Sequence, residues 1–250
     1  MLGSIGKAGR VLDLFTPQRP EWGVKETALA LGIPRSSAHD LLSTLVVTGL
    51  LRRCAGNRYR LGWKVLDLGR TVLVADEVRR HAHPVMTRLA AGLLATTHLA
   101  VLDAGEVVYV DKVAGRGAFA VPLSAVGKRL PPHCSAVGKV LLAHRPRAEA
   151  AEMLALGGME AFTARTSTSV DASLAALDGV RARGWAEDHG EAVDGLRCVA
   201  APVREAGEVV AALSVCFAAS APAADRLAAA ARAGAAEVTR TLQGAVALAS

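Results

Sequence analysis

The side chains best suited to chemistry in this chain of 250 residues gather near its N-terminus. A Gly-Ile-Pro turn at residues 32–34 precedes a polar stretch, and four arginines follow within residues 52–60. Arginine donates two hydrogen bonds to guanine, and serine reaches bases or phosphates. The pattern predicts a contact with nucleic acid. Alternatively, the serines cap a helix and the arginines lie on a hairpin that faces only solvent. The polar side chains are Arg35, Ser36, Ser37 and His39, and the arginines are Arg52, Arg53, Arg58 and Arg60.

The net charge of +6 is confined to the same region. Residues 1–80 hold 13 Lys and Arg against 7 Asp and Glu, whereas residues 81–250 hold 16 of each. A small basic unit joined to a larger neutral one indicates a polyanion partner. Charge alone leaves DNA, RNA and an anionic membrane open, with solubility as the alternative explanation.

Hydrophobic spacing places these side chains on a helix-turn-helix with a wing. The expected elements are a short helix around Val11 to Phe15, helices over 25–31 and 35–48, and strands over 50–53 and 58–61. In this motif the second helix of the pair enters the major groove, and the wing lies along phosphates or the minor groove. The candidate DNA contacts are Lys25, Thr27, Arg35, Ser36, Ser37, His39, Asp40, Arg52, Arg53, Asn57, Arg58 and Arg60.

The rest of the chain predicts a linker helix and a larger α+β domain. The domain boundaries expected are 1–62, 63–82 for the linker helix and 83–250, with Pro84 in the first turn of the next helix. Adjacent hairpins among helices indicate an antiparallel sheet. Strands are expected over 98–103, 107–113, 118–124, 196–204 and 209–217, and helices over 135–144, 149–155, 172–183 and 223–247.

A second candidate site begins where small residues start a helix after Pro131. Free backbone N–H groups and the helix dipole attract anions there, although the full phosphate-loop spacing is absent. Two alternatives invoke thiols: an enzyme using Cys134 beside His133, or a redox sensor using Cys134, Cys198 or Cys216. The wide spacing of the cysteines argues against a zinc ribbon or a disulfide framework, and no cofactor or metal is expected.

Two motif blocks resemble the IclR family, the isocitrate-lyase-regulator-type transcription factors of bacteria. The N-terminal block contains GRVLDLF, ALALGIPRSSAHDLLSTLVVTGLLRR and NRYRLG, and the second contains VGKRLPPHCSAVGKVLLA and RGWAEDHGEAVDGLRCVAAPVRE. The resemblance implies a winged helix-turn-helix joined by a helix to a GAF-like effector-binding domain. It also implies a regulator rather than an enzyme, expected to be a repressor, acting as a dimer or dimer of dimers on an inverted-repeat DNA operator.

The resemblance further implies a small organic acid effector, aromatic acids included, and seven residues that would bind it. This chain departs from the family at Cys216, where a hydroxyl is common, and at Asp40, where arginine is common. A thiol enlarges the site, which favours a bulkier or less polar ligand. The cysteines could instead be core residues, and Asp188 could cap a turn. The implied effector residues are Ser135, Ala136, Val137, Asp188, Cys198, Ser214 and Cys216.

The location expected from the sequence is the cytoplasm. The longest apolar stretch is Val209 to Ala219, interrupted by Ser214. A transmembrane helix needs about 20 residues, and the N-terminus lacks the apolar core of a secretion signal. No membrane partner is therefore expected.

Overall fold

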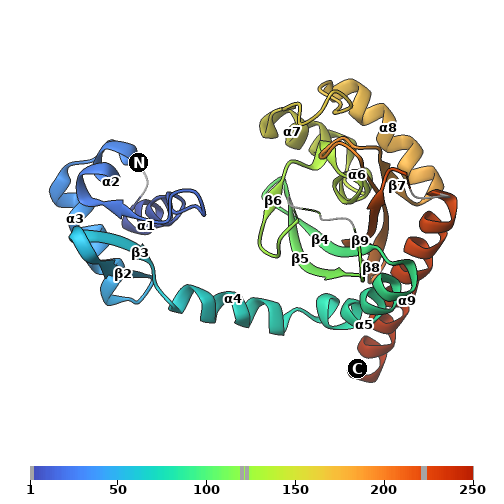
Figure 1. Cartoon of the computed structure of the whole chain (residues 1–250), viewed down its shortest axis with the longest axis horizontal. Coiled ribbons are helices and arrows are strands. Elements are labelled where there is room, and N and C mark those ends of the chain that lie inside the picture. Colours follow the sequence, from blue (N-terminus) through green and yellow to red (C-terminus); the bar gives the residue numbers. More distant parts are fainter. Residues whose placement is uncertain (1–2, 119–120, 122–123, 221–223, 250) are drawn as a thin grey trace. The chain divides into compact units, whose positions relative to one another are not determined.

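The chain forms two compact units. The computed structural model describes residues 3–118, 121, 124–220 and 224–249. Contacts between residues divide the chain into unit 1, residues 1–75, and unit 2, residues 76–250 (Figure 1).

Unit 1 is a small helical domain with a three-stranded antiparallel sheet in the order β1-β3-β2. Its hydrophobic core joins helices and sheet through Val11, Leu42, Leu45, Leu51 and Tyr59. Its elements are α1 (Ser4–Leu12), β1 (Trp22–Gly23), α2 (Val24–Leu31), α3 (Arg35–Val47), β2 (Leu51–Cys54), a 3₁₀ turn (Ala55–Asn57), β3 (Arg58–Leu61) and α4 (Lys64–Ala75).

Local sequence explains most of unit 1. Gly32 ends α2 in the left-handed conformation with φ of 65°, which glycine adopts without steric cost. The residues Ala38, Leu42 and Leu45 of α3 are buried, as their helical spacing predicts. Two details differ from expectation: α1 ends at Leu12 instead of continuing through Phe15, and β1 is too short for a periodicity signal.

The linker region differs from the single helix expected over residues 63–82. α4 ends at Ala75, and α5 (Glu77–Leu93) begins after Asp76. The Asp76 carboxylate accepts a hydrogen bond from Arg79 N at 2.7 Å, so it caps the new helix. Pro84 consequently lies inside α5 and not in a first turn.

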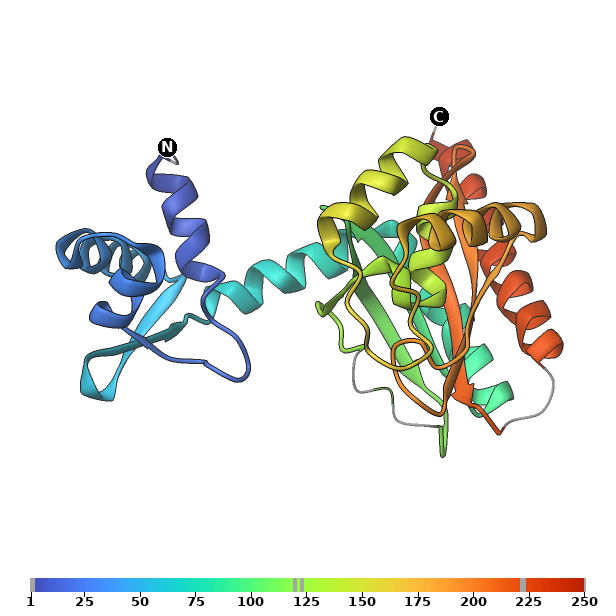
Figure 2. The same cartoon turned by 90° about the horizontal axis from the view of Figure 1, so that it is seen from above.

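Unit 2 is a six-stranded antiparallel sheet in the order β6-β5-β4-β9-β8-β7, with helices on both faces (Figures 1 and 2). Helices α5 and α9 cover one face, and α6 packs on the other. The remaining elements are β4 (Thr96–Asp103), β5 (Glu106–Ala114), β6 (Arg129–Leu130), α6 (Ala136–Ala143), α7 (Arg147–Gly157), α8 (Val170–Arg183), β7 (Ala186–Asp188), β8 (Leu196–Glu205), β9 (Glu208–Ala218) and α9 (Ala224–Ala249).

The two faces of the sheet carry separate cores. Leu99, Leu213 and Val203 pack with α5 and α9, while Ala100 and Cys216 belong to the core under α6. The expected α+β class is confirmed, and the four strands expected around the two hairpin turns are present within two residues. The short strands β6 and β7 were not expected. Most of the strand expected over 118–124 lies outside the described residues. The same holds for position 223, the expected start of the last helix.

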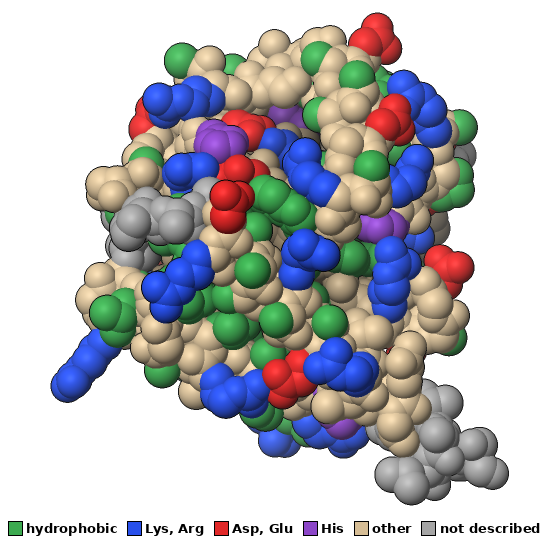
Figure 3. Space-filling view, turned by 90° about the vertical axis from the view of Figure 1, so that its right-hand side faces the viewer, with side chains coloured by type: hydrophobic (Ala, Val, Ile, Leu, Met, Phe, Trp, Pro, Cys, Tyr) green, Lys and Arg blue, Asp and Glu red, His purple; other side chains and the backbone are tan. Residues whose placement is uncertain are grey.

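The surface of unit 2 is mixed in charge. On the face seen in Figure 3, acidic side chains lie among a larger share of basic ones. In the part of the chain that the structure describes, no helix is both long and apolar enough to cross a membrane.

Candidate functional site

Helix α3 presents a polar face at its N-terminus. Arg35, Ser36, His39 and Asp40 are exposed, and Ser37 is half-buried. The opposite face, with Ala38, Leu42 and Leu45, is buried in the unit 1 core. His39 Nδ1 lies 3.5 Å from Asp40 Oδ1, so the carboxylate has a neighbouring imidazole. The N-terminal turn of α3 therefore offers donors and acceptors in the position from which this motif reads base edges.

The four wing arginines differ in their surroundings. Arg58 Nε lies 3.1 Å from Glu21 Oε2, and its guanidinium also pairs with Glu26 at 3.2 Å. Arg60 pairs with the same Glu21. These two side chains therefore hold the hairpin to the segment before α2.

The other two arginines stack on aromatic rings. The guanidinium of Arg52 lies 5.4 Å from the ring centre of Trp63, and that of Arg53 lies 5.7 Å from Tyr59. Arg52 is half-buried, whereas Arg53 is exposed. Arg53 is accordingly the wing arginine best placed to meet a phosphate.

Three further predicted contacts have distinct positions. Lys25 is exposed on the first turn of α2, and Asn57 occupies the wing turn with φ of 60°. Thr27 is fully buried, and its hydroxyl donates to Gly23 O at 3.0 Å. The structure thus corrects the assignment of Thr27, whose hydroxyl bonds inside α2 and does not face the surface.

Exchange of Arg53 and of Arg58 for glutamine should have different consequences. Arg53→Gln is expected to leave the melting temperature unchanged and to reduce the salt slope of DNA binding by about one. Arg58→Gln is expected to destabilise unit 1 by about 1 kcal/mol, because it breaks the pairs with Glu21 and Glu26. Thermal melts and salt titrations of both variants check this; equal effects on both readouts would contradict it.

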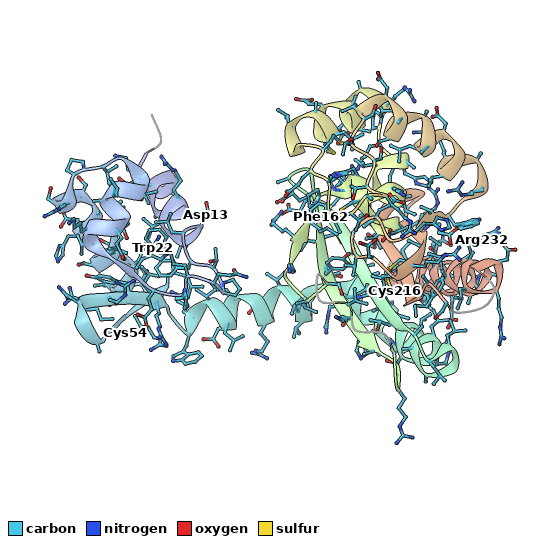
Figure 4. All side chains as sticks on the ribbon, turned by 45° about the horizontal axis from the view of Figure 1, so that its top comes forward. Asp13, Trp22, Cys54, Phe162, Cys216 and Arg232 are labelled. Atoms are coloured by element: carbon cyan, nitrogen blue, oxygen red, sulfur yellow. A yellow bond between two sulfur atoms is a disulfide. The ribbon has the colours of Figure 1, made fainter. Side chains whose placement is uncertain are left out.

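The implied effector residues of unit 2 meet on the face of the sheet under α6. Asp188 pairs with Cys198 in the β7–β8 register, and Cys198 pairs with Cys216 across β8–β9. Two residues further along β9, Ser214 pairs with His98 of β4. Alternate residues of a strand share a face, so these side chains form one buried polar cluster. Figure 4 labels Cys216 in this sheet.

The N-terminus of α6 borders this cluster. The Ser135 hydroxyl accepts a hydrogen bond from Gly138 N at 3.1 Å, so Ser135 is the N-cap. The N–H groups of Ala136 and Val137, in the first turn, have no partner within the helix. Gly138 packs so closely against Pro132 that an added Cβ would overlap the Pro132 carbonyl. Ser135, Ala136 and Val137 are buried, so an anion there would sit away from bulk water.

A disulfide joins Cys198 and Cys216, although the wide spacing of the cysteines argued against a disulfide framework. The two residues are direct partners on adjacent strands with Cα atoms 4.1 Å apart. Cys54 and Cys134 are free thiols. The pair therefore contributes sulfur atoms, and no S–H donors, to the polar cluster.

Thiol titration under denaturing conditions tests the pairing. Without reductant the unfolded chain is expected to expose two reactive thiols, and after reduction four. Cys198→Ser should expose three in both conditions, because it frees Cys216. Four thiols in the unreduced wild type would contradict the pairing.

The geometry does not support the thiol-enzyme alternative. Burial, together with the nearby Asp188 carboxylate, raises the pKa of the Cys134 thiol to about 12. A nucleophilic cysteine needs the opposite shift. His133 Nε2 lies 2.9 Å from Glu160 O and donates to it, as expected for a structural histidine. Among the described residues, no group of three or more His, Cys, Asp and Glu is placed to hold a metal ion.

Asp188 both closes a turn and faces the cluster. Its Oδ1 accepts a hydrogen bond from Glu191 N at 2.6 Å, which agrees with the turn-cap alternative. The side chain is only 2% exposed, and burial raises the pKa of its carboxyl to about 7. The hydrogen bonds to the backbone of Glu191 and the charge of Lys139 act in the opposite direction.

The raised pKa of Asp188 makes stability depend on pH. The folded state favours the protonated acid, so its contribution is present below about pH 4 and is lost as pH rises through about 7. Each pKa unit is about 1.4 kcal/mol, so the loss is on the order of a few kcal/mol. Asp188→Asn should melt with a flatter pH dependence between pH 4 and 7; identical profiles for wild type and variant would contradict this.

Two members of the cluster were missed by the sequence analysis. His98 lies in the apolar run of β4 and is 1% exposed. Lys112 pairs with it in the β4–β5 register and donates from Nζ to Val121 O at 2.8 Å. Alternation from Tyr109, which belongs to the core under α6, would place Lys112 on the other face of the sheet. A bulge in the β4–β5 pairing brings Lys112 to the cluster, so no local signal could have indicated its position.

Family comparisons account for both units. Residues 4–54 match the IclR helix-turn-helix domain, and residues 70–240 match the bacterial transcriptional regulator IclR C-terminal domain. The chain belongs to the IclR family. The resemblance and the fold class expected from the sequence are therefore confirmed. An IclR helix-turn-helix domain binds DNA, and the C-terminal domain takes a small-molecule ligand.

Named relatives of this IclR-family chain are also regulators. It is 37% identical to the transcriptional regulator XynR of Escherichia coli K12, over 86% of each chain, and 33% identical to KdgR of the same organism, over 86% of this chain and 82% of that one. An IclR homolog from Microbacterium hydrocarbonoxydans, complexed with 4-hydroxybenzoate, superposes with a TM-score of 0.82 at 27% identity, covering 97% of this chain and all of that one. The prediction that this chain is a regulator and not an enzyme is confirmed.

Proposed function

We propose that this IclR-family regulator is a repressor that binds an inverted-repeat operator as a homodimer, or a dimer of dimers, and releases it on binding a small organic acid. The observation that carries the proposal is the exposed polar N-terminal turn of α3, with Arg35, Ser36 and His39, above a fully buried apolar face. This arrangement suits insertion into a major groove. Chromosomal DNA as the partner places the protein in the cytoplasm.

Self-association is supported by the apolar surface of α4. Leu66, Val72 and Val74 of this helix are each about two-thirds exposed, and no residue of α4 is buried in the single chain. A second copy of α4 would remove this surface from water. Two α3 helices about 34 Å apart would then read half-sites one helical turn apart.

An organic acid as the effector is supported by the buried cluster of unit 2. The first-turn N–H groups of α6 and the Lys112 ammonium suit a carboxylate, and the related Microbacterium protein was crystallised with 4-hydroxybenzoate. The ligand shifts DNA affinity only by the difference in its own affinity for the two states of the protein.

Fluorescence anisotropy tests the proposal with duplex DNA from upstream of the protein's own gene and a scrambled duplex. Preferential binding with a steep salt dependence, reversed by an organic acid, is the expected result. Equal binding of both duplexes would contradict sequence reading. A transcription assay on the same promoter separates repression from activation, and increased transcript in the presence of protein alone would contradict the repressor assignment.

A further inference from the structure

Among the described residues of the buried cluster, His98 is the one imidazole, and the proposed function gives it no role. It lies on β4 between Ser124 on one side and Ser214 and Cys216 on the other. Its ring centre is 5.3 Å from that of Tyr109. All of these side chains are less than one-tenth exposed.

The two contacts of Ser124, taken together, indicate which nitrogen of His98 carries hydrogen. Ser124 Oγ lies 2.7 Å from His98 Nε2 and 3.1 Å from Val121 O. A carbonyl can only accept, so the contact with Val121 O, which also accepts from Lys112 Nζ, is a hydrogen bond only if the single Ser124 hydroxyl hydrogen points to it. Both contacts are satisfied together only if Nε2–H donates to Ser124 Oγ. His98 Nδ1 is then a bare acceptor.

The described contacts of His98 Nδ1 leave this acceptor without a strong donor. Ser214 Oγ and Cys216 Sγ each lie 3.5 Å away. The serine contact is at the outer limit of hydrogen-bond length, and a disulfide sulfur has no hydrogen to donate. A buried acceptor of this kind gains from a donor supplied by a ligand.

His98 is suited to the hydroxyl of a ligand and not to its carboxylate. Burial, with a smaller effect of the Lys112 charge, lowers the pKa of His98 to about 3, so the ring is neutral. The lone pair on Nδ1 of the neutral ring repels a carboxylate and accepts a hydrogen bond from an O–H group. The carboxylate has its own partners in the Lys112 ammonium and the N–H groups at the start of α6.

We propose that His98 is a specificity-determining residue, which selects effectors that carry a hydroxyl group in addition to the acid group. The hydroxyl donates to His98 Nδ1 while the carboxylate is held by the other donors of the cluster. This inference rests on the proposed function and narrows its effector class to hydroxy acids.

Matched acid pairs test the inference on the full chain. Isothermal titration would compare 4-hydroxybenzoate with benzoate, and lactate with propionate. The hydroxy member of a pair is expected to bind roughly 10-fold more tightly or better, because its partner leaves the buried acceptor unpaired. Equal binding of the two members, or binding of none of the four acids, would overturn the inference. Specific operator binding in the anisotropy assay would still stand as support for DNA recognition.

Variants of His98 connect this preference to the residue. His98→Leu should reduce the preference to within about twofold, and His98→Asn, which keeps an acceptor near Nδ1, should retain most of it. The ratio of the dissociation constants of the two acids in a pair does not change when part of the protein is inactive. An unchanged ratio in His98→Leu would overturn the inference.

Nitrogen NMR of the ¹⁵N-labelled wild type supplies a test that needs no variant. The His98 ring should show hydrogen on Nε2 alone. The Nδ1 resonance should move when the hydroxy acid is added and stay fixed with its partner acid. Hydrogen on Nδ1, or equal shifts with both acids, would overturn the inference.

Discussion

Gly138→Ala is expected to lower the melting temperature of unit 2 by roughly 2–12 °C and to abolish effector binding. The added Cβ would overlap the backbone carbonyl of Pro132, which belongs to a short 3₁₀ turn and cannot rotate away as a side chain could. Overpacking of this kind costs about 1–3 kcal/mol or more, and each kcal/mol shifts the melting temperature of a domain of this size by about 2–4 °C. Scanning fluorimetry and ligand titration measure the two effects.

Gly92→Ala is the matched control for this variant. Gly92 is also a helical glycine of unit 2, but nothing lies within 4 Å of a Cβ added there. Alanine at that position is expected to be neutral or to stabilise by about 0.5–1 kcal/mol. A Gly138→Ala protein that melts as Gly92→Ala does would show that the start of α6 is not held against Pro132.

Arg35→Ala is expected to weaken operator binding by roughly 5- to 150-fold and to relax sequence preference. Arg35 is the first residue of α3 and is exposed, so its guanidinium is free to reach a guanine. A bidentate base contact contributes about 1–3 kcal/mol of discrimination. The measurement is anisotropy with operator and scrambled duplexes at one fixed salt concentration.

Arg232→Ala removes the same charge from an exposed position on α9 of unit 2 (Figure 4). Its operator affinity should match that of the wild type. Equal losses in both variants would mean that net charge, and not the α3 surface, governs binding. Loss of affinity without loss of preference in Arg35→Ala would reassign the residue to a phosphate contact.

Local signals predicted most of unit 1 and the main hairpins of unit 2. The apolar face of α3 and the turns before and after this helix depend on residues only a few positions apart. The sequence alone therefore predicts them. The helix break at Asp76 was missed because proline is the stronger sequence signal for a helix start, and Pro84 lies a few residues further on. Pro84 lacks a backbone N–H, but it is tolerated inside α5, where its side chain is exposed.

The candidate effector site was only partly predictable, because register decides it. Counted from the turn after Glu205, Cys198 would lie opposite Val215. A bulge between Val203 and Arg204 shifts the pairing by one residue and brings Cys198 opposite Cys216. No local sequence pattern predicts that bulge. His98 was missed for a different reason: a single histidine within an apolar run reads as core, and only the approach of Ser124 gives it a chemical setting.

The division of the chain between Ala75 and Asp76 has a practical meaning for protein engineering. A splice at this point leaves the hydrophobic cores of both units whole and retains the Asp76 cap at the start of α5. Residues 76–250 could therefore be transplanted behind the reader domain of another family member, with an established promoter as output. Such a chimera would report the effector of this protein in living cells before its own operator is known.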